Sequence, residues 1–413
     1  MVIGFVIKIL GFILGYCFLY LISQFFEAKV VGLYSLSITI MYILSILPRV
    51  GMDLLLTKLS SQSLLKSSDF FEDNEYLHGT ATVFFLSSIL GILLFLLSHY
   101  VALFFGSVEL EPQLKIAAIG IPLINLIQIN ASVLRGFKMD RWYLFFQNSG
   151  RFGFAILIFT LLMIFNTKQT NPIAAMVFAF GMLTFLSFCL LPFKLNISKI
   201  RYLNVFNVKR IVTQGLPFMV TSSVLLSIGW TDKIVLGIFR PESEVGVYEV
   251  IYKIAAVLGF LLTVINAFIS PSVVQYYERG EIKSLQKLLS KYARINIVFT
   301  LILFLILFLS IKKILLLFGE EYLIGVSAFY ILIFGQLVNS LSGSVGLIMQ
   351  MTGYHKEFRN IISIGFLLNL VLSFLLVGEY GLQGVALASS ISFLFWNIKS
   401  IFFLKKNIGI VPF

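Results

Sequence analysis

Residues 31–53 read VGLYSLSITIMYILSILPRVGMD, and this stretch decides the fold. It starts with a Val-Gly-Leu-Tyr motif, stays apolar for most of its length and then carries Arg49. A similar stretch in the second half, VGVYEVIYKIAAVLGFLLTVINAFISP, carries Lys253. The motif glycines, Gly32 and Gly246, lie 214 residues apart, about half of the 413-residue chain. The sequence therefore indicates two copies of one unit, with a cation on a corresponding helix of each copy.

The composition requires a lipid environment. Hydrophobic residues make up 59% of the chain and charged residues 12%, and the mean hydropathy is +0.98. A soluble protein is typically about 25% charged. The apolar runs are continuous and reach the roughly 20 residues that a spanning helix needs, which favours helices over barrel strands. We therefore predict an all-α integral membrane protein, whose first apolar run is a retained helix because no cleavage site follows it.

The apolar runs predict about twelve spanning helices in two parallel six-helix lobes, which cover residues 1–199 and 200–413. Gly136 and Gly353 each close a predicted span and lie 217 residues apart, close to the first offset. Six is an even number, so both lobes enter the membrane in the same orientation and would face each other across a cleft. The predicted spans are 2–25, 30–56, 79–104, 114–134, 142–165, 172–193, 211–238, 245–274, 293–318, 323–350, 359–378 and 383–403.

The basic residues predict the orientation of the chain. With both termini cytoplasmic, 20 of the 31 Lys and Arg residues lie in inner connections and six in outer ones, as the positive-inside rule requires. This distribution explains the net charge of +12 without nucleic-acid binding. No loop could hold a soluble catalytic domain, and the GxxxxGK[ST] phosphate-binding motif is absent. The basic residues that remain fall within predicted spans: Lys8, Arg49, Arg151, Lys233 and Lys253.

These cations are candidate site residues, because a charge in hydrocarbon costs several kcal/mol unless it is paired or hydrated. Asp53 follows Arg49 by four positions, and Glu249 precedes Lys253 by four, so each acid could pair with its cation along one helix face. Both cations lie on the repeated helix. We therefore weigh structural pairing against a role in a shared cationic cavity.

The other intramembrane charges leave similar alternatives open. Lys8 and Arg151 could either line the cavity or extend to the inner surface. Asp232 and Lys233 are adjacent near the predicted outer edge, where a structural role is expected. Two cysteines and three histidines are scattered without metal-ligand spacing, so we predict no metal and no other cofactor.

The chain resembles the Wzx-type O-antigen and capsule flippases of the multidrug/oligosaccharidyl-lipid/polysaccharide (MOP) superfamily. The resemblance covers nearly the whole chain. It rests on VGLYSL at 31–36, on DKIVLG at 232–237 with VGVY at 245–248, and on the segments around Gly136 and Gly353.

The resemblance implies a MATE-like fold and a bacterial inner-membrane protein that turns an undecaprenyl-diphosphate-linked oligosaccharide to the outer leaflet. It implies a central cationic cavity, onto which Lys8, Arg49 and Lys253 map. Arginine suits bidentate phosphate contact, and lysine supplies a mobile charge. No bond is broken, so we expect no enzyme activity. Expected partners are membrane lipid, a polysaccharide polymerase complex, and Na⁺ or H⁺, with Asp53, Glu249 and Asp232 as candidate coupling carboxylates.

Three alternatives remain. A multidrug exporter of the MATE type shares the two-lobe plan but exports cations, and it would favour buried carboxylates over buried cations. A lipid II flippase has a similar mechanism and usually two extra spans. A membrane polysaccharide polymerase or ligase typically carries a long outer loop, which is absent here.

Overall fold

The computed structural model is helical throughout its described residues, which are 2–49, 51–66, 75–165, 171–191 and 229–412. Ten helices in this part of the chain are long and apolar enough to cross a membrane. The longest, α15 (His355–Asn407), is interrupted at Gly381, where φ is 51°. This break lies between the predicted spans 359–378 and 383–403. The predicted span 211–238 lies largely outside the described residues, so the number twelve stays a prediction.

The chain divides into two compact units. Unit 1 contains Met1–Phe25 and Leu33–Ser223, and unit 2 contains Phe26–Gly32 and Val224–Phe413. The predicted boundary between residues 199 and 200 lies outside the described residues. Helix α2 (Ala28–Arg49) begins in unit 2 and continues in unit 1. The other elements of unit 1 are α1 (Val2–Phe25), α3 (Met52–Lys66), α4 (Glu75–Phe104), α5 (Leu110–Gly136), α6 (Asp140–Leu144), the π-helical η1 (Phe145–Ser149), α7 (Gly150–Phe165) and α8 (Pro172–Leu190).

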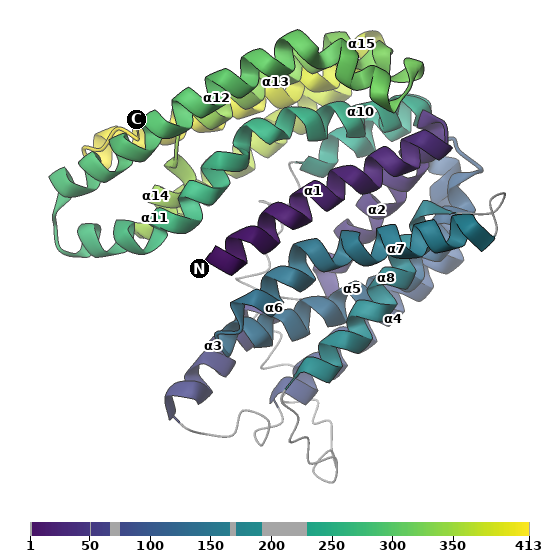
Figure 1. The fold of residues 1–413 in the computed structure, drawn as a ribbon, viewed down its shortest axis with the longest axis horizontal. Coiled ribbons are helices and arrows are strands. Elements are labelled where there is room, and N and C mark those ends of the chain that lie inside the picture. Colours follow the sequence, from purple (N-terminus) through teal and green to yellow (C-terminus); the bar gives the residue numbers. More distant parts are fainter. Residues whose placement is uncertain (1, 50, 67–74, 166–170, 192–228, 413) are drawn as a thin grey trace. The chain divides into compact units, whose positions relative to one another are not determined.

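Helix α5 forms the centre of unit 1, because α3, α4 and α8 all pack against it (Figure 1). In its most apolar window 72% of the residues are buried. Three polar side chains inside this core, those of Tyr76, Asn130 and Ser187, form hydrogen bonds with one another. The Tyr76 hydroxyl donates to Asn130 Oδ1 at 2.7 Å, and Asn130 Nδ2 donates to Ser187 Oγ at 2.8 Å. These bonds join α4, α5 and α8 where unpaired polar groups would be costly.

Two irregular segments of unit 1 divide predicted spans. The predicted span 30–56 is two helices, since α2 ends one residue after Pro48 and α3 begins after Gly51, whose φ is 71°. That backbone conformation favours glycine. The predicted span 142–165 contains η1, a wider π-helical turn of a kind that often occurs at functional sites. Gly11 of α1 packs directly on this turn, so that a Cβ there would lie 2.7 Å from the Ser149 nitrogen.

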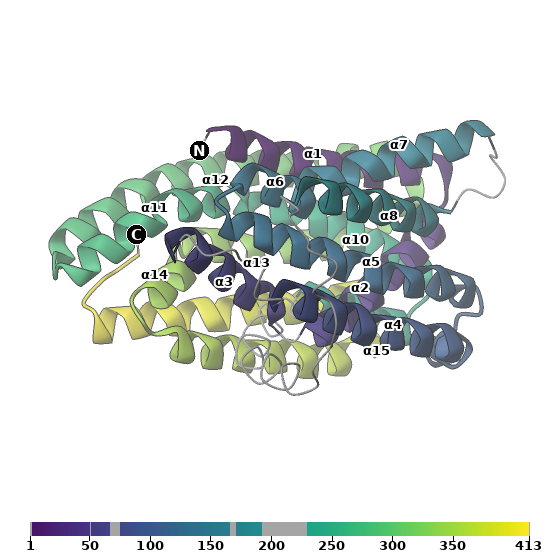
Figure 2. The same ribbon diagram turned by 90° about the horizontal axis from the view of Figure 1, so that it is seen from below.

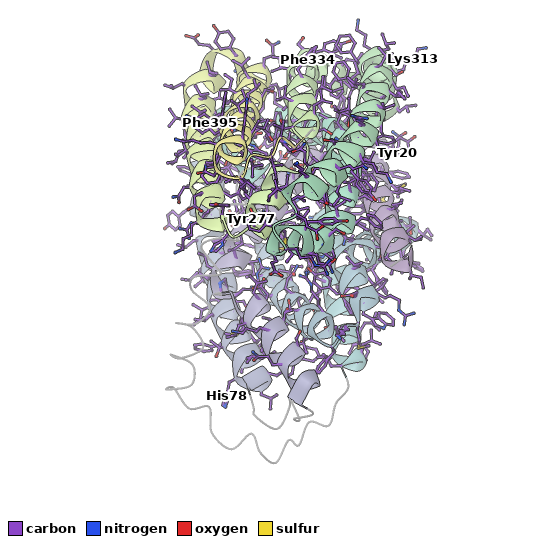
Figure 3. The ribbon with its side chains drawn as sticks, turned by 90° about the vertical axis from the view of Figure 1, so that its left-hand side faces the viewer. Tyr20, His78, Tyr277, Lys313, Phe334 and Phe395 are labelled. Atoms are coloured by element: carbon purple, nitrogen blue, oxygen red, sulfur yellow. The ribbon has the colours of Figure 1, made fainter. Side chains whose placement is uncertain are left out.

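In unit 2, α13 packs against α10, α12 and α15, and α14 packs against α15 (Figure 2). Exposed apolar side chains such as Phe334 cover the outside of this unit (Figure 3). Its predicted span 323–350 is divided by Gly343, which has a φ of 70°. The elements are a helical segment at 229–239, α10 (Glu242–Ala256), the 3₁₀ turn η3 (Val257–Gly259), α11 (Phe260–Glu278), α12 (Ile282–Phe318), η4 (Glu320–Gly325), α13 (Val326–Leu341), α14 (Val345–Met351) and α15.

The two repeated Val-Gly-x-Tyr motifs meet in unit 2. A Cβ on Gly32 would overlap the Glu242 carbonyl, and a Cβ on Gly246 would overlap the Ala28 carbonyl. The crossing is therefore reciprocal, because each motif glycine receives the backbone of the opposite helix. Glu321 fixes the same end of α2 by accepting a 2.6 Å hydrogen bond from the Ala28 nitrogen through Oε1. The repeated glycines are thus explained by a backbone contact between the first turns of α2 and α10.

Replacing Gly246 with alanine is expected to destabilise the protein, because a backbone carbonyl cannot move aside as a side chain can. Overpacking of this kind costs about 1–3 kcal/mol. We expect the thermal unfolding temperature of the purified protein to fall by several degrees. Gly378→Ala is the matched control, since a Cβ there meets nothing within 4 Å. An unchanged unfolding temperature for Gly246→Ala would contradict the crossing.

Candidate functional site

Arg49 and Asp53 form the predicted pair, but across the break between α2 and α3 and not along one continuous helix. Arg49 Nη1 lies 3.7 Å from Asp53 Oδ2, and the two side chains are 15% and 23% exposed. Arg49 Nε also donates to the Ser45 carbonyl at 3.1 Å. The ion pair is therefore long and partly hydrated, and the remaining guanidinium donors are available for a second anion.

Arg151 enters the same part of unit 1 from the start of α7. Its Nε donates to the Phe146 carbonyl at 3.0 Å, and its Nη2 donates to Gln147 Oε1 at 3.2 Å. Among the described residues no carboxylate lies within ion-pair distance of Arg151. It lies close enough to Arg49 for their charges to repel. Unit 1 therefore contains two neighbouring guanidinium groups, of which Arg49 pairs with Asp53.

Lys8 is half-buried on α1. It shares a helix face with Gly4 and Gly11, which pack against Leu144 and Asn148 near the π-helical turn. The described part of the chain offers Lys8 no carboxylate partner. Unit 1 therefore holds three intramembrane cations and one nearby carboxylate. Such an excess of positive charge in a membrane helix bundle favours an anionic ligand.

Unit 2 carries the second group of predicted residues, with Glu249 at its centre. Glu249 Oε2 lies 2.5 Å from Lys233 Nζ, and Glu249 Oε1 lies 3.2 Å from Lys253 Nζ. Lys253 and Glu249, which the four-residue spacing allows to pair, are in contact. The pairing of Lys233 was not predicted, and it ties the segment 229–239 to α10. The Glu249 carboxylate therefore contacts both lysines of this group.

Asp232 points away from its neighbour Lys233 into a fully buried network. Its Oδ2 accepts hydrogen bonds of 2.5 Å from both the Tyr248 and the Ser389 hydroxyls, and its Oδ1 accepts one of 3.0 Å from Asn369 Nδ2. Among the described residues, Asn369 Oδ1 and the hydroxyl of Ser373, one turn later, are buried and have no hydrogen-bond partner. The network joins the segment 229–239, α10 and α15 of unit 2 around the Asp232 carboxylate.

The structure thus brings the predicted residues into three clusters and adds residues that the sequence reading missed. Lys8, Arg49, Asp53 and Arg151 belong to unit 1, while Lys233, Glu249 and Lys253 form one cluster of unit 2 and Asp232 another. No group of three His, Cys, Asp or Glu side chains in the described ranges could hold a metal ion. The residues that were missed are neutral, and polar residues inside apolar spans are the signal that could have found them: Gln128, Gln147, Tyr248, Asn369, Ser373 and Ser389.

Many apolar helices with cations inside two helical units define a multi-pass membrane protein of the transporter type. The chain matches the family "Polysaccharide biosynthesis protein" over residues 1–268 and the MatE family over residues 217–375. Because the first match covers more than half of the chain, the protein belongs to the polysaccharide biosynthesis protein family. The predicted resemblance is confirmed at this level, and the family indicates a transporter and not an enzyme.

Relatives and solved structures agree with this assignment. Over 194 residues, 46% of this chain, it is 25% identical to a probable low-salt glycan biosynthesis flippase, Agl15, from Haloferax volcanii. The match spans only 41% of that relative. The fold is similar to an inward-closed structure of the lipid II flippase MurJ, with a TM-score of 0.79, 17% identity, and coverage of 98% of this chain and 88% of MurJ. It is equally similar to an inward-facing multidrug MATE transporter, with a TM-score of 0.79, 13% identity, and coverage of 99% and 98%. The predicted all-α, MATE-like fold is therefore confirmed.

Proposed function

We propose that this protein is a flippase that moves an undecaprenyl-diphosphate-linked oligosaccharide across the bacterial inner membrane by alternating access. The observation that carries the proposal is the charge of unit 1, where Lys8, Arg49 and Arg151 are cations and, among the described residues, only Arg49 has a carboxylate, Asp53, within ion-pair distance. A diphosphate supplies the negative charge that this unit lacks. Arginine can bind phosphate through two parallel hydrogen bonds, which adds geometric selectivity to charge. Family membership and the glycan flippase relative support the same class of substrate.

We propose that Lys253 also contacts the diphosphate during transport. Lys253 and Arg49 lie on the helices that carry the repeated motif, and each lies within ion-pair distance of a carboxylate four positions away. A mobile lysine ammonium can follow a phosphate during a conformational change, whereas the arginine holds it more rigidly. We place both termini in the cytoplasm, because the distribution of basic residues favours that orientation.

We also propose that Asp232 binds the coupling ion, Na⁺ or H⁺. Asp53 and Glu249, the other two candidates, form ion pairs with cations, whereas Asp232 is held by neutral donors. Oxygen ligands, including the unpartnered Asn369 Oδ1 and Ser373 Oγ, suit a hard cation. Alternatively, a proton on the carboxylate would neutralise a charge that is fully buried.

The sequence repeat supports one coupling site, in unit 2, because the corresponding positions of unit 1 hold aromatic residues. The residues 214 positions before Asp232 and Tyr248 are Phe18 and Tyr34, and the residue 217 positions before Asn369 is Phe152. In unit 1 these rings pack together, with centroids 5.7 Å apart for Phe18–Tyr34 and 6.5 Å apart for Phe18–Phe152. An aromatic cluster thus occupies the position that corresponds to the polar network of unit 2.

The test is reconstitution of the purified protein into vesicles. We expect a fluorescent undecaprenyl-diphosphate oligosaccharide added to one leaflet to reach the other, with a rate that depends on an imposed Na⁺ or H⁺ gradient. Efflux of a cationic dye without movement of the lipid-linked sugar would instead indicate a multidrug exporter. Growth of the sugar chain in the vesicles would indicate a polymerase. Either result would overturn the proposal.

A further inference from the structure

Two glutamine side chains pair with each other in unit 1, next to the arginines. Gln128 of α5 donates from Nε2 to Gln147 Oε1 at 3.4 Å, and Gln147 Nε2 donates back to Gln128 Oε1. Both side chains are partly exposed, so a ligand can reach them. Gln147 Oε1 also accepts the 3.2 Å hydrogen bond from Arg151 Nη2. The amide pair therefore directly adjoins one of the proposed phosphate-binding groups.

The pair can open for a ligand. Each primary amide offers two donors and one acceptor oxygen, so the reciprocal arrangement satisfies both groups while no ligand is present. The bond from Gln128 to Gln147 is long for an N–H···O hydrogen bond and is correspondingly weak. A ligand that supplies both a donor and an acceptor could replace it without leaving a polar group unsatisfied.

Two further observations indicate that the surroundings of the two glutamines favour polar contacts. Gln147 lies in the π-helical turn η1, and Arg151 is the second residue of α7, which follows that turn, so the irregular backbone determines the position of both. One turn before Gln128 on α5, Asn125 is fully buried, and both polar atoms of its amide lack a hydrogen-bond partner in the part of the chain that the structure describes. Buried amides without partners are rare, and they point to a ligand or water molecule in the interior of unit 1.

We infer that Gln128 and Gln147 recognise an acetamido group on C2 of the sugar that is bonded directly to the diphosphate. The inference rests on the proposed function, in which Arg49 and Arg151 hold the diphosphate. Because Gln147 contacts Arg151, a group that reaches the amides must lie close to a phosphate oxygen. The C2 substituent fits, since C2 is adjacent to the anomeric carbon that carries the phosphate.

The acetamido group matches the pair better than a hydroxyl does. Its N–H donates to one glutamine carbonyl, while its C=O accepts from the amide nitrogen of the other glutamine. These two atoms lie on opposite sides of a planar amide and can bridge the two side chains at once. A hydroxyl offers a single oxygen atom between them. The pair would therefore select 2-acetamido sugars at this position of the substrate.

The experiment measures binding of three polyprenyl diphosphates to the purified full-length protein: one with N-acetylglucosamine, one with glucose and one without sugar. We expect wild type to prefer the acetamido sugar over glucose about tenfold, the usual effect of one added hydrogen-bonded group. Q128M/Q147M keeps the side-chain length and removes both amides. It should abolish this preference. Q128M leaves the hydrogen bond between Gln147 and Arg151 in place, so it should weaken the preference while its affinity for the sugar-free lipid stays unchanged.

Controls keep the possible results distinct. Gln336→Met removes an amide from unit 2, where Gln336 Oε1 accepts a hydrogen bond from Asn339, and it should retain the preference. The single variants Q128M and Q147M report on the same site if the double variant fails to fold. Equal binding of both sugars by wild type, or a preference that survives in folded Q128M/Q147M, would overturn the inference and leave the proposed function standing. Failure of folded wild type to bind any polyprenyl diphosphate would overturn both.

Discussion

Arg49→Ala is expected to lower the rate of lipid-linked oligosaccharide flipping by roughly 10- to 100-fold. A hydrogen bond to a charged group contributes about 1.5–3 kcal/mol, and each 1.4 kcal/mol corresponds to about a factor of ten. The loss should be large because Arg151 and Lys8 remain as cations but cannot reproduce the contact at the end of α2. Surface polysaccharide in a strain that lacks its own flippase, together with the vesicle assay, would measure the effect.

Arg49→Lys separates charge from geometry. Lysine keeps the positive charge and its long-range attraction but loses the planar pair of donors, so we expect intermediate activity. Arg279→Ala is the matched control, since Arg279 is exposed at the end of α11 and should tolerate alanine. If Arg49→Ala reaches the membrane at normal levels and restores full activity, Arg49 does not hold the diphosphate.

Asp232→Asn is expected to remove the dependence of transport on an ion gradient and to lower net transport at least about tenfold. Asparagine has nearly the same shape and still offers an oxygen to Tyr248 and Ser389, so the helices should stay packed. It carries no charge, and therefore it neither takes up a proton nor attracts a cation. Flipping rates with and without imposed Na⁺ and H⁺ gradients would measure the effect.

A second measurement distinguishes coupling from a purely structural role of Asp232. A cation that binds only the folded protein raises its stability as its concentration rises. We expect NaCl to raise the unfolding temperature of wild type more than KCl does if Na⁺ is the coupling ion, and Asp232→Asn to remove this difference. Asp140→Asn, an exposed substitution at the start of α6, should behave as wild type. Full gradient dependence in Asp232→Asn would exclude this residue as the coupling site.

The sequence pattern predicted the class of fold because lipid imposes a simple rule. Every backbone polar group in hydrocarbon must be bonded internally, so long apolar runs become helices. The positions of most spans followed from that rule. The interruptions of predicted spans near Gly51 and Gly343 did not follow from that rule. A glycine in a spanning helix can also mark a close contact between backbones, as Gly32 and Gly246 do. Only the tertiary structure shows whether a given glycine ends a helix or allows a close contact.

The candidate site was predicted in part. Charged residues are conspicuous in apolar spans, and the pairs Arg49–Asp53 and Glu249–Lys253 followed from helical spacing. The contact between Lys233 and Glu249 could not be predicted, since it joins two helices through side chains 16 positions apart. The amides of Gln128 and Gln147 were overlooked for the same reason. A neutral polar side chain becomes informative only when its partner on another helix is known.

By itself the sequence determined that this chain lies in a membrane, that it carries a Val-Gly-x-Tyr motif twice, and which cations and acids its helices must accommodate. Those properties follow from composition and from the spacing of residues along the chain, because a lipid environment restricts both directly. Tertiary structure alone decided which carboxylate neutralises which cation, and it alone isolated Asp232 among hydroxyls and an amide. The physical reason is that charge compensation in hydrocarbon acts over a few ångströms in space, between helices that are far apart along the chain.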